Sequence, residues 1–431
     1  MDIKSLQTLL AVSLIAALAP AIVAGLRRPR VPQVVLLILC GILIGKQGLG
    51  LEDTSSIKLI SNVGLGFLFL LAGYELDPRL LREQAGKLAI TGWVLSAAIA
   101  VGAVALLGSF GLVRDFVPIG LALTTTALGT LLPILHDNDM LAGKFGRYVL
   151  AAGAVGELFP ILAISLFLTD RAQFAALISI AAVAVVAFAL TALPRVIGAA
   201  RLRAVIEQGQ RATAQTTLRW SVVLLFLLLV VAARFGLDVV LGALLAGMVL
   251  RRWTRRMGVA VTALEEKLDA LGYGFFIPVF FVTSGMTLDI KAVVEHPLRL
   301  IIFFLLLLVV RGLPSLLVYR RALPLRERLE MTFVAATTMP LLIALAEIGL
   351  SDGIMIPANA AAMVGAGVLS VLVFPSVAGA LARRGQPDPD AGTMDAVVVT
   401  EARVVGEISG EGDPLAPDEG YTADGGTAET D

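Results

Sequence analysis

Charge is the property that this sequence most lacks for its length. Charged residues make up 16% of its 431 residues, whereas a soluble domain carries roughly 25%. Basic and acidic residues number 34 each, so the net charge is zero and neither nucleic acid nor a polyanion is expected as a partner. The shortage of charge excludes an ordinary set of soluble domains and favours a chain embedded in a membrane.

Cysteine and histidine are also scarce. Cys40 is the only cysteine and lies in an apolar run, so it cannot form an internal disulfide and is interpreted as a small core residue. The sequence has only two histidines, and no His, Cys and Asp set has the spacing of a metal site or a catalytic triad. An enzyme is therefore the least favoured class, and no metal or organic cofactor is expected.

Hydrophobic residues, in contrast, make up 58% of the sequence and fall into long blocks. Many blocks approach the roughly 20 residues that a helix needs to cross a bilayer. The sequence predicts an all-α polytopic membrane protein with about 13 transmembrane helices. The predicted spans are residues 5–26, 33–45, 57–74, 88–107, 116–135, 147–168, 173–197, 218–234, 236–250, 270–286, 298–319, 330–349 and 354–382.

Basic residues gather in every second loop between these spans. Arg27 and Arg28 follow the first span, for example, and Arg251 and Arg252 follow the ninth. Because basic loops tend to stay in the cytoplasm, this pattern places the N-terminus outside and the C-terminus in the cytoplasm. We therefore predict a multi-pass protein of a bacterial inner membrane.

The composition changes at about residue 385. Acidic residues there face a single basic residue, Arg403, and Gly, Pro and Thr fill much of the remainder. Such a segment has too little apolar surface to pack as a core. We predict a transmembrane domain over residues 1–384 and an acidic, disordered cytoplasmic tail over residues 385–431.

An internal repeat relates two parts of the chain. Residues 41–45 (GILIG) precede the apolar segment 67–77, and residues 242–247 (GALLAG) precede the similar segment 276–289. The two copies lie seven spans apart, so they cross the membrane in opposite directions. Inverted repeats of this kind are typical of secondary transporters, which bind their substrate at the midplane between the repeats. The alternative is a chance similarity between apolar strings.

Two ionisable residues lie midway along predicted spans. Glu157 is at the centre of the sixth span and Arg311 at the centre of the eleventh. A carboxylate at this depth is costly and is a functional hypothesis by default: when buried it can exchange protons, and when ionised it can bind a cation instead. Arg311 is the natural counter-charge. The alternatives are a structural role for Glu157 and an Arg311 side chain that reaches the membrane surface.

Two further spans are interrupted at the same depth. Hydroxyl groups crowd the centre of the fifth span, and a proline follows two threonines in the twelfth. A broken helix at this depth is tolerated only inside the protein or beside a cavity, where its freed backbone groups can bind ions. We predict an ion or proton site at Glu157, Thr125 and Thr126, beside a crossing of two broken helices formed by Thr124, Thr130, Thr337, Thr338 and Pro340. The alternative is an intact helix whose hydroxyls bond to its own carbonyls.

Residues 31–45 and 64–77 resemble the opening of the monovalent cation:proton antiporter-2 family. The resemblance extends from about residue 5 to 380, and it implies a thirteen-helix homodimer whose mobile core, with crossed broken helices, moves against a dimerisation domain. It also implies that Glu157 binds the ion and that Arg311 stands where the family usually has lysine.

The sequence departs from this family in three ways. Gly156-Glu157 stands where members of the family usually have Asp-Asp or Asn-Asp, and Met339-Pro340-Leu341 stands where they frequently have Gly-Glu. In addition, no nucleotide-binding domain is expected. A single carboxylate favours electroneutral exchange of one Na⁺ or K⁺ for one proton. The alternatives are a transporter of another small solute, such as an organic anion bound by Arg311, and a membrane sensor that transports nothing.

Overall fold

The computed structural model describes residues 3–25, 32–51, 55–76, 78–113, 115–128, 131, 135, 140–141, 143–168, 173–197, 215–257 and 261–383. These residues form helices, and no strand occurs among them. Thr130 and the predicted tail over residues 385–431 lie outside this part of the chain.

Ten of the described helices are long and apolar enough to cross a membrane, so the chain is a multi-pass membrane protein. Three predicted spans are absent from this set for different reasons: α2 (Gln33–Ile44) is short, α11 (Val239–Met257) ends in several arginines, and the fifth span is interrupted. The ten are Ile3–Gly25, Ile57–Glu75, Gln84–Ser109, Gly143–Phe167, Gln173–Ala192, Thr216–Arg234, Leu264–Thr287, Pro297–Val318, Leu325–Ser351 and Pro357–Ala382. The total of thirteen remains a prediction.

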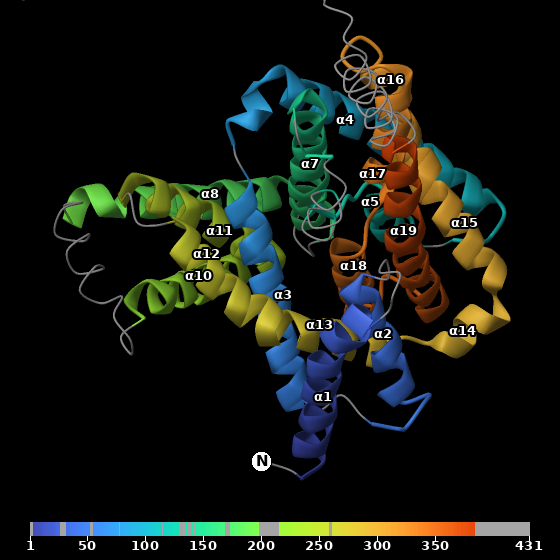
Figure 1. Cartoon of the computed structure of the whole chain (residues 1–431), viewed down its shortest axis with the longest axis horizontal. Helices are drawn as coiled ribbons and strands as arrows, with labels where there is room; N and C mark the ends of the chain where they lie inside the picture. The colour runs from blue at the N-terminus through green and yellow to red at the C-terminus, as the bar shows by residue number, and fades with distance from the viewer. Residues whose placement is uncertain are drawn as a thin grey trace, which may run out of the picture. The chain divides into compact units, whose positions relative to one another are not determined.

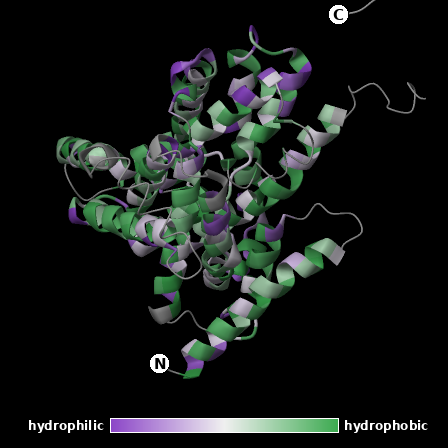
Figure 2. Cartoon of the chain, turned by 60° about the vertical axis from the view of Figure 1, so that its left-hand side comes forward, coloured by the Kyte–Doolittle hydropathy of each residue, from purple (hydrophilic) through white to green (hydrophobic). Residues whose placement is uncertain are grey.

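The outer surfaces of several helices are apolar. Leu10, Val101 and Phe174 are among the large hydrophobic side chains that are more than two-thirds exposed. In Figure 2 hydrophobic colour covers most of the helix surfaces, and hydrophilic colour is concentrated at helix ends. Exposed apolar surface on this scale fits helices that face lipid.

The helices pack into two groups (Figure 1). The first, which we call the scaffold group, contains α1 (Ile3–Gly25), α2, α3 (Ser55–Glu75), α10 (Thr216–Arg234), α11, α12 (Val261–Leu271), the π-helical turn η2 (Gly272–Phe276) and α13 (Ile277–Thr287). The second, the core group, contains α4 (Gln84–Ser109), α5 (Phe116–Ala122), α7 (Gly143–Phe167), α15 (Pro297–Leu307), the π-helical turn η3 (Leu308–Gly312), α16 (Leu313–Val318), α17 (Leu325–Ala336), α18 (Pro340–Ser351) and α19 (Pro357–Arg383).

Three further elements connect the groups. The short 3-10 turn η1 (Leu80–Arg82) leads from α3 to α4, and α14 (Ile290–Glu295) leads from α13 to α15. The long helix α8 (Gln173–Ile197) packs against α7 of the core group and against α10 and α11 of the scaffold group.

Glycines explain the closest helix crossings of the scaffold group. A Cβ atom added to Gly41 of α2 would lie 2.1 Å from a backbone oxygen of α13, where Gly285 stands opposite. A Cβ atom added to Gly73 of α3 would lie 2.0 Å from a backbone oxygen of α11, and Gly247 stands opposite. Each crossing joins a helix from one copy of the repeat to a helix from the other, as an inverted repeat requires.

Both predicted breaks are present. The chain leaves the helical conformation after α5, over residues 123–127, which we call the first break. It leaves it again between α17 and α18, over residues 337–339, the second break. Pro340 is the first residue of α18, where its missing N–H group costs nothing.

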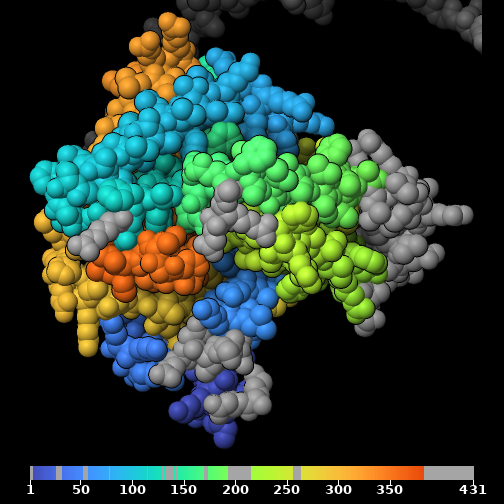
Figure 3. Space-filling view, turned by 180° about the vertical axis from the view of Figure 1, so that it is seen from behind, coloured from blue at the N-terminus to red at the C-terminus, as the bar shows by residue number. Residues whose placement is uncertain are grey.

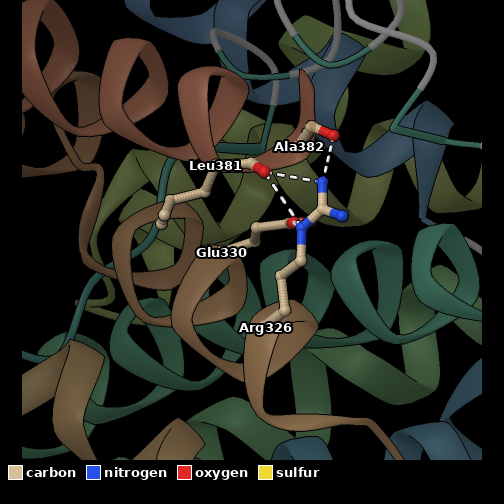
Figure 4. A network of polar contacts seen from close by, with 4 residues as sticks. All are labelled: Arg326, Glu330, Leu381 and Ala382. Carbon is tan, nitrogen blue, oxygen red and sulfur yellow. Dashed lines mark hydrogen bonds and ion pairs between the residues drawn. The ribbon is translucent and has the colours of Figure 1, made fainter. Parts of the chain in front are cut away.

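The end of α19 is fixed to the start of the second broken helix (Figure 4). Arg326 of α17 donates through Nε and Nη2 to the carbonyl oxygen of Leu381, at 3.0 and 2.6 Å, and through Nη2 to that of Ala382. Glu330, one turn further along α17, lies 3.2 Å from Nε of the same arginine. A basic side chain that donates to the last carbonyl oxygens stabilises the C-terminal end of a helix. These bonds therefore hold the N-terminal part of α17 against the end of α19, ahead of the second break.

Candidate ion-binding site

The two breaks cross and hydrogen-bond to each other. The backbone N–H of Ala127 donates to the carbonyl oxygen of Thr337 at 3.0 Å. The hydroxyl of Thr126 donates to the carbonyl oxygen of Ala335 at 2.6 Å, and the hydroxyls of Thr125 and Thr338 lie 2.5 Å apart. These bonds satisfy backbone groups that a broken helix would otherwise leave unpaired inside the membrane.

The hydroxyls of the first break also complete the end of α5. Thr124 donates to the carbonyl oxygen of Leu121, and Thr125 donates to that of Ala122, both at 2.7 Å. Bonding back to the helix was the alternative to a break; here it accompanies the break, because the chain stops being helical just beyond these carbonyls.

α7 passes directly behind the first break, and two glycines make room for it. A Cβ atom added to Gly153 would lie 2.6 Å from the Leu128 side chain. A Cβ atom added to Gly156 would lie 2.5 Å from Cβ of Thr126 and 2.8 Å from Nη2 of Arg311. In addition, the backbone N–H of Thr126 donates to the carbonyl oxygen of Gly156 at 3.0 Å. The break can therefore lie against α7 only because both positions lack side chains.

Glu157 follows Gly156 on α7 and is buried, with 6% of its surface exposed. Its Oε1 accepts a 2.7 Å hydrogen bond from the backbone N–H of Leu128, just after the first break. A carboxylate that accepts a backbone N–H bond is stabilised in its ionised form, whereas burial favours the neutral acid. The Glu157 carboxyl group is thus fixed at the end of the first break by a backbone bond.

Arg311 enters the same region from the π-helical turn η3 and is also buried. Its Nε donates to the hydroxyl of Thr126 at 2.8 Å, and its Nη2 donates to the carbonyl oxygen of Ala152 at 3.0 Å. The side chain is held inside the core group by these bonds, so the alternative of a side chain that reaches the membrane surface does not describe this structure.

Glu157 lines a small internal cavity, which we call the chamber. Its volume is about 20 Å³, enough for about one water-sized particle. The core group contributes Ala127, Glu157, Pro340 and Leu341, and the scaffold group contributes Leu68, Phe69, Ala72, Glu75 and Tyr273. The chamber thus lies between the two groups of helices.

Glu75 is the residue that the sequence analysis missed. It is the last residue of α3 and lines the chamber together with Glu157. Within the described part of the chain, its Oε2 is buried and has no hydrogen-bond partner. The signal was a glutamate directly after a predicted span that ended at residue 74; a residue in that position reads as part of a loop at the membrane surface.

The other predicted site residues have varied positions. Thr337 and Thr338 form the second break, and Pro340 lines the chamber at the N-terminus of α18. Thr125 and Thr126 lie at the crossing, where their hydroxyls bond to other protein groups, and neither lines the chamber. Whether any of these residues contacts an ion remains a prediction.

Residues 13–384 match the transmembrane region that defines the sodium/hydrogen exchangers. The chain belongs to the sodium/hydrogen exchanger family. This agrees with the family resemblance noted from residues 31–45 and 64–77.

Individual relatives within this family are distant. The protein named Na(+)/H(+) antiporter YjbQ, from Bacillus subtilis, is 27% identical over 80% of this chain and 58% of its own length. The glutathione-regulated potassium-efflux system protein KefC, from Shigella flexneri, is 29% identical over 64% of this chain and 44% of its own length. The chain thus spans about half the length of these two relatives.

The fold of a solved exchanger agrees with the family assignment. The sodium proton antiporter MjNhaP1 from Methanocaldococcus jannaschii has a TM-score of 0.66 and 19% sequence identity, and the match covers 88% of this chain and 99% of that one. At this identity the likeness establishes the fold alone. The chain therefore has the exchanger fold with two broken, crossing helices.

Proposed function

We propose that this protein is a secondary active antiporter that exchanges Na⁺ or K⁺ for protons. The observation that carries the proposal is the position of Glu157: a buried carboxylate beside two crossed broken helices, facing a chamber of about 20 Å³. Family membership supports this reading, since YjbQ is named as an Na⁺/H⁺ antiporter and KefC as a potassium-efflux protein.

A proton and a cation would compete for Glu157. When the carboxylate is ionised, the Leu128 N–H group and the N-terminus of α18 stabilise its charge. A monovalent cation would then bind the carboxylate and nearby backbone oxygens in place of part of its water shell. When Glu157 takes up a proton, that attraction ends and the cation leaves. The protein's own groups perform every step, so the mechanism uses no cofactor.

Thr125 and Thr126 would serve this site by holding its shape. In the conformation seen here the Thr125 hydroxyl bonds to that of Thr338 in the second break, and the Thr126 hydroxyl donates to the Ala335 carbonyl oxygen and accepts from Nε of Arg311. We propose that they position the backbone of the first break beside the chamber, and that the buried Arg311 side chain balances the charge of the carboxylate within the core group.

Transport requires the site to face each side of the membrane in turn. The chamber lies between the scaffold and core groups, so a movement of one group against the other would open it. Glu157 belongs to the core group and would travel, whereas Glu75 belongs to the scaffold group and would stay. Glu75 would therefore meet the bound ion only in conformations like this one.

The distribution of basic loops supports an N-terminus outside and a C-terminus in the cytoplasm of a bacterial inner membrane. We propose that the functional unit is a homodimer in the bilayer, as the family resemblance implies. An organic anion as substrate would need several donors in one pocket, whereas the chamber is lined by two carboxylates, Glu75 and Glu157, and no basic residue among its described residues.

The test is exchange by the purified full-length protein in proteoliposomes with an internal pH-sensitive dye. Pulses of Li⁺, Na⁺, K⁺ and Rb⁺ are added in turn, and at least one should drive proton movement. The profile against pH should be bell-shaped, because low pH blocks cation binding and high pH deprives the exchange of protons. Absence of cation-driven proton movement for all four ions would refute the proposal.

Glu157→Gln should abolish this exchange and leave the protein folded, because the amide is nearly isosteric but can neither ionise nor bind a proton. Glu157→Asp should retain partial activity with an altered apparent cation affinity, since the charge survives on a shorter side chain. Exchange at the wild-type rate by purified Glu157→Gln would show that another residue carries the ion.

A further inference from the structure

A second cavity among the described residues differs from the chamber in size and in the chemistry of its lining. It has a volume of about 560 Å³ and is lined by five arginines and a set of apolar side chains. The arginines are Arg79, Arg82, Arg251, Arg252 and Arg255, and the apolar lining includes Ala184, Ala187, Phe188, Leu245, Met248 and Val249. Among the described lining residues there is no carboxylate, so this part of the lining combines basic side chains with apolar walls. We call it the arginine cavity.

The C-terminal ends of three membrane helices meet at this cavity. Pro78, Arg79 and Arg82 of η1 follow the end of α3, and the remaining lining residues belong to the middle and C-terminal parts of α8 and α11. The indole N–H group of Trp253 on α11 donates to the carbonyl oxygen of Leu190 on α8 at 2.8 Å and joins the two helices there. Half-buried tryptophan is typical of the boundary between the membrane core and water.

Two of the arginines are already oriented by the protein. Arg251 donates through Nη1 to the carbonyl oxygen of Tyr74 at 2.5 Å, and the guanidinium carbon of Arg252 lies 5.8 Å from the centre of the Phe188 ring. A guanidinium that stacks on an aromatic ring presents its N–H groups in a fixed plane, which suits recognition of phosphate oxygens. Glu265 lies close enough to Tyr74 to act on it electrostatically but does not line the cavity.

We propose that the arginine cavity binds the headgroup phosphate of an anionic phospholipid. The apolar wall decides in favour of a lipid over a soluble phosphate compound, because it continues onto membrane-facing surface: Val185 and Phe188 of α8 are 66% and 67% exposed. On the face drawn in Figure 3, the green surface of α8 runs between the blue surface of α4 and the yellow-green surface of α10. An acyl chain can follow this wall while the phosphate contacts the arginines, and basic pockets between membrane helices favour anionic headgroups for this reason.

A lipid in this cavity would contact α11 of the scaffold group and two of the elements, η1 and α8, that connect the scaffold group to the core group. η1 packs against α4 and α7 of the core group, whereas α11 packs against α3 of the scaffold group. A headgroup that bridges Arg82 of η1 and Arg252 of α11 would therefore stabilise the arrangement of the two groups seen here. Lipid binding does not depend on the proposed exchange activity and can be measured without it.

The experiment compares delipidated wild-type protein with Arg82→Gln/Arg252→Gln. Both side chains are exposed and make no side-chain hydrogen bond within the described residues, so their loss should not disturb folding. Arg320→Gln/Arg321→Gln is the matched control: it removes the same charge from exposed arginines outside the cavity. Native mass spectrometry and detergent melting temperature are followed during titration with phosphatidylglycerol, cardiolipin, phosphatidylethanolamine or sn-glycerol 3-phosphate.

Wild type and the control should bind phosphatidylglycerol or cardiolipin in preference to phosphatidylethanolamine and melt at a higher temperature with it. The cavity variant should bind the anionic lipid about tenfold more weakly or worse, since each basic residue near an anionic headgroup contributes substantially to binding. Equal loss in the control variant would show that net charge alone attracts the lipid. Equal protection by sn-glycerol 3-phosphate would show a soluble-phosphate site. Either result would overturn the proposal.

Discussion

At the scale of single residues, Gly156 limits the charge that the site can hold. A side chain at this position would need space that is filled here by Thr126 and by the Arg311 guanidinium. Gly156 and Arg311 thus belong together: the small residue leaves room for a large fixed cation beside one carboxylate. This packing gives a physical reason why glycine stands at position 156.

Gly156→Ala should lower both the melting temperature and the exchange rate. An added Cβ would lie 2.5 Å from Cβ of Thr126, and forcing extra volume into a packed interior costs roughly 1–3 kcal/mol. The control is Gly102→Ala in α4, where an added Cβ meets nothing within 4 Å, so stability should be unchanged or slightly higher. Equal behaviour of the two variants in detergent melting and in exchange would contradict the close packing at Gly156.

Arg311→Ala should destabilise the protein more than Arg311→Lys. The alanine variant loses two hydrogen bonds from a charged donor, to Thr126 and Ala152, each worth about 1.5–3 kcal/mol. Lysine keeps the charge and can still reach one acceptor, although it lacks the planar fork of the guanidinium. The measurement is the melting temperature of each purified variant in detergent. An unchanged melting temperature for Arg311→Ala would contradict a structural role for the two Arg311 hydrogen bonds.

At the scale of helices, the breaks followed from local chemistry. Pro340 cannot donate a helical hydrogen bond, and the threonine hydroxyls offer the backbone other partners, so both interruptions and their pairing by the inverted repeat were predictable. The first break begins at residue 123, one residue before the threonines, and Thr124 and Thr125 lie within it, where their hydroxyls bond to the last carbonyl oxygens of α5.

Other features needed the folded structure. The side-chain direction of Glu75 depends on how α3 packs against α11 and η2, and spacing along the chain does not reveal it. The π-helical turns η2 and η3 place Tyr273 and Arg311, and single π turns have no strong sequence signature. The ninth predicted span ended at residue 250, whereas α11 continues to Met257, since long arginine side chains let a helix run past the apolar boundary.

Thr126→Val tests whether the threonine hydroxyls hold the crossing or bind the ion. Valine keeps the shape but loses the bond to the Ala335 carbonyl oxygen and the acceptor for Arg311 Nε, so the melting temperature should fall. Thr126→Ser keeps the hydroxyl and should behave nearly as wild type. If the hydroxyl is structural, any exchange left in Thr126→Val will keep the wild-type order of preference among Li⁺, Na⁺, K⁺ and Rb⁺. A changed order would assign the hydroxyl to the ion.

At the scale of the whole membrane domain, two separate cavities lie at the boundary between the scaffold group and the core group. The chamber lies at the N-terminus of α18, and a second cavity of about 40 Å³ lies along the C-terminal part of the same helix. There Ser284 of α13 donates to Oε1 of Glu347 on α18 at 2.8 Å. Glu347 thus takes part in a contact between the scaffold group and the core group. α18 is the element whose sliding would change both cavities at once.

The stoichiometry of exchange follows from which carboxylates move. Among the described residues that line the chamber, Glu157 is the only titratable group of the core group. Glu75 lies on the scaffold group, and a carboxylate that does not travel cannot carry a second proton across. We therefore predict electroneutral exchange of one proton for one monovalent cation.

In proteoliposomes clamped with valinomycin and K⁺, with Na⁺ or Li⁺ as the transported ion, an imposed potential should leave the steady-state ion gradient unchanged, both in wild type and in Glu75→Gln. A gradient that follows the potential in wild type but not in Glu75→Gln would mean that both carboxylates release protons during the cycle, and the single-carrier mechanism would then be wrong.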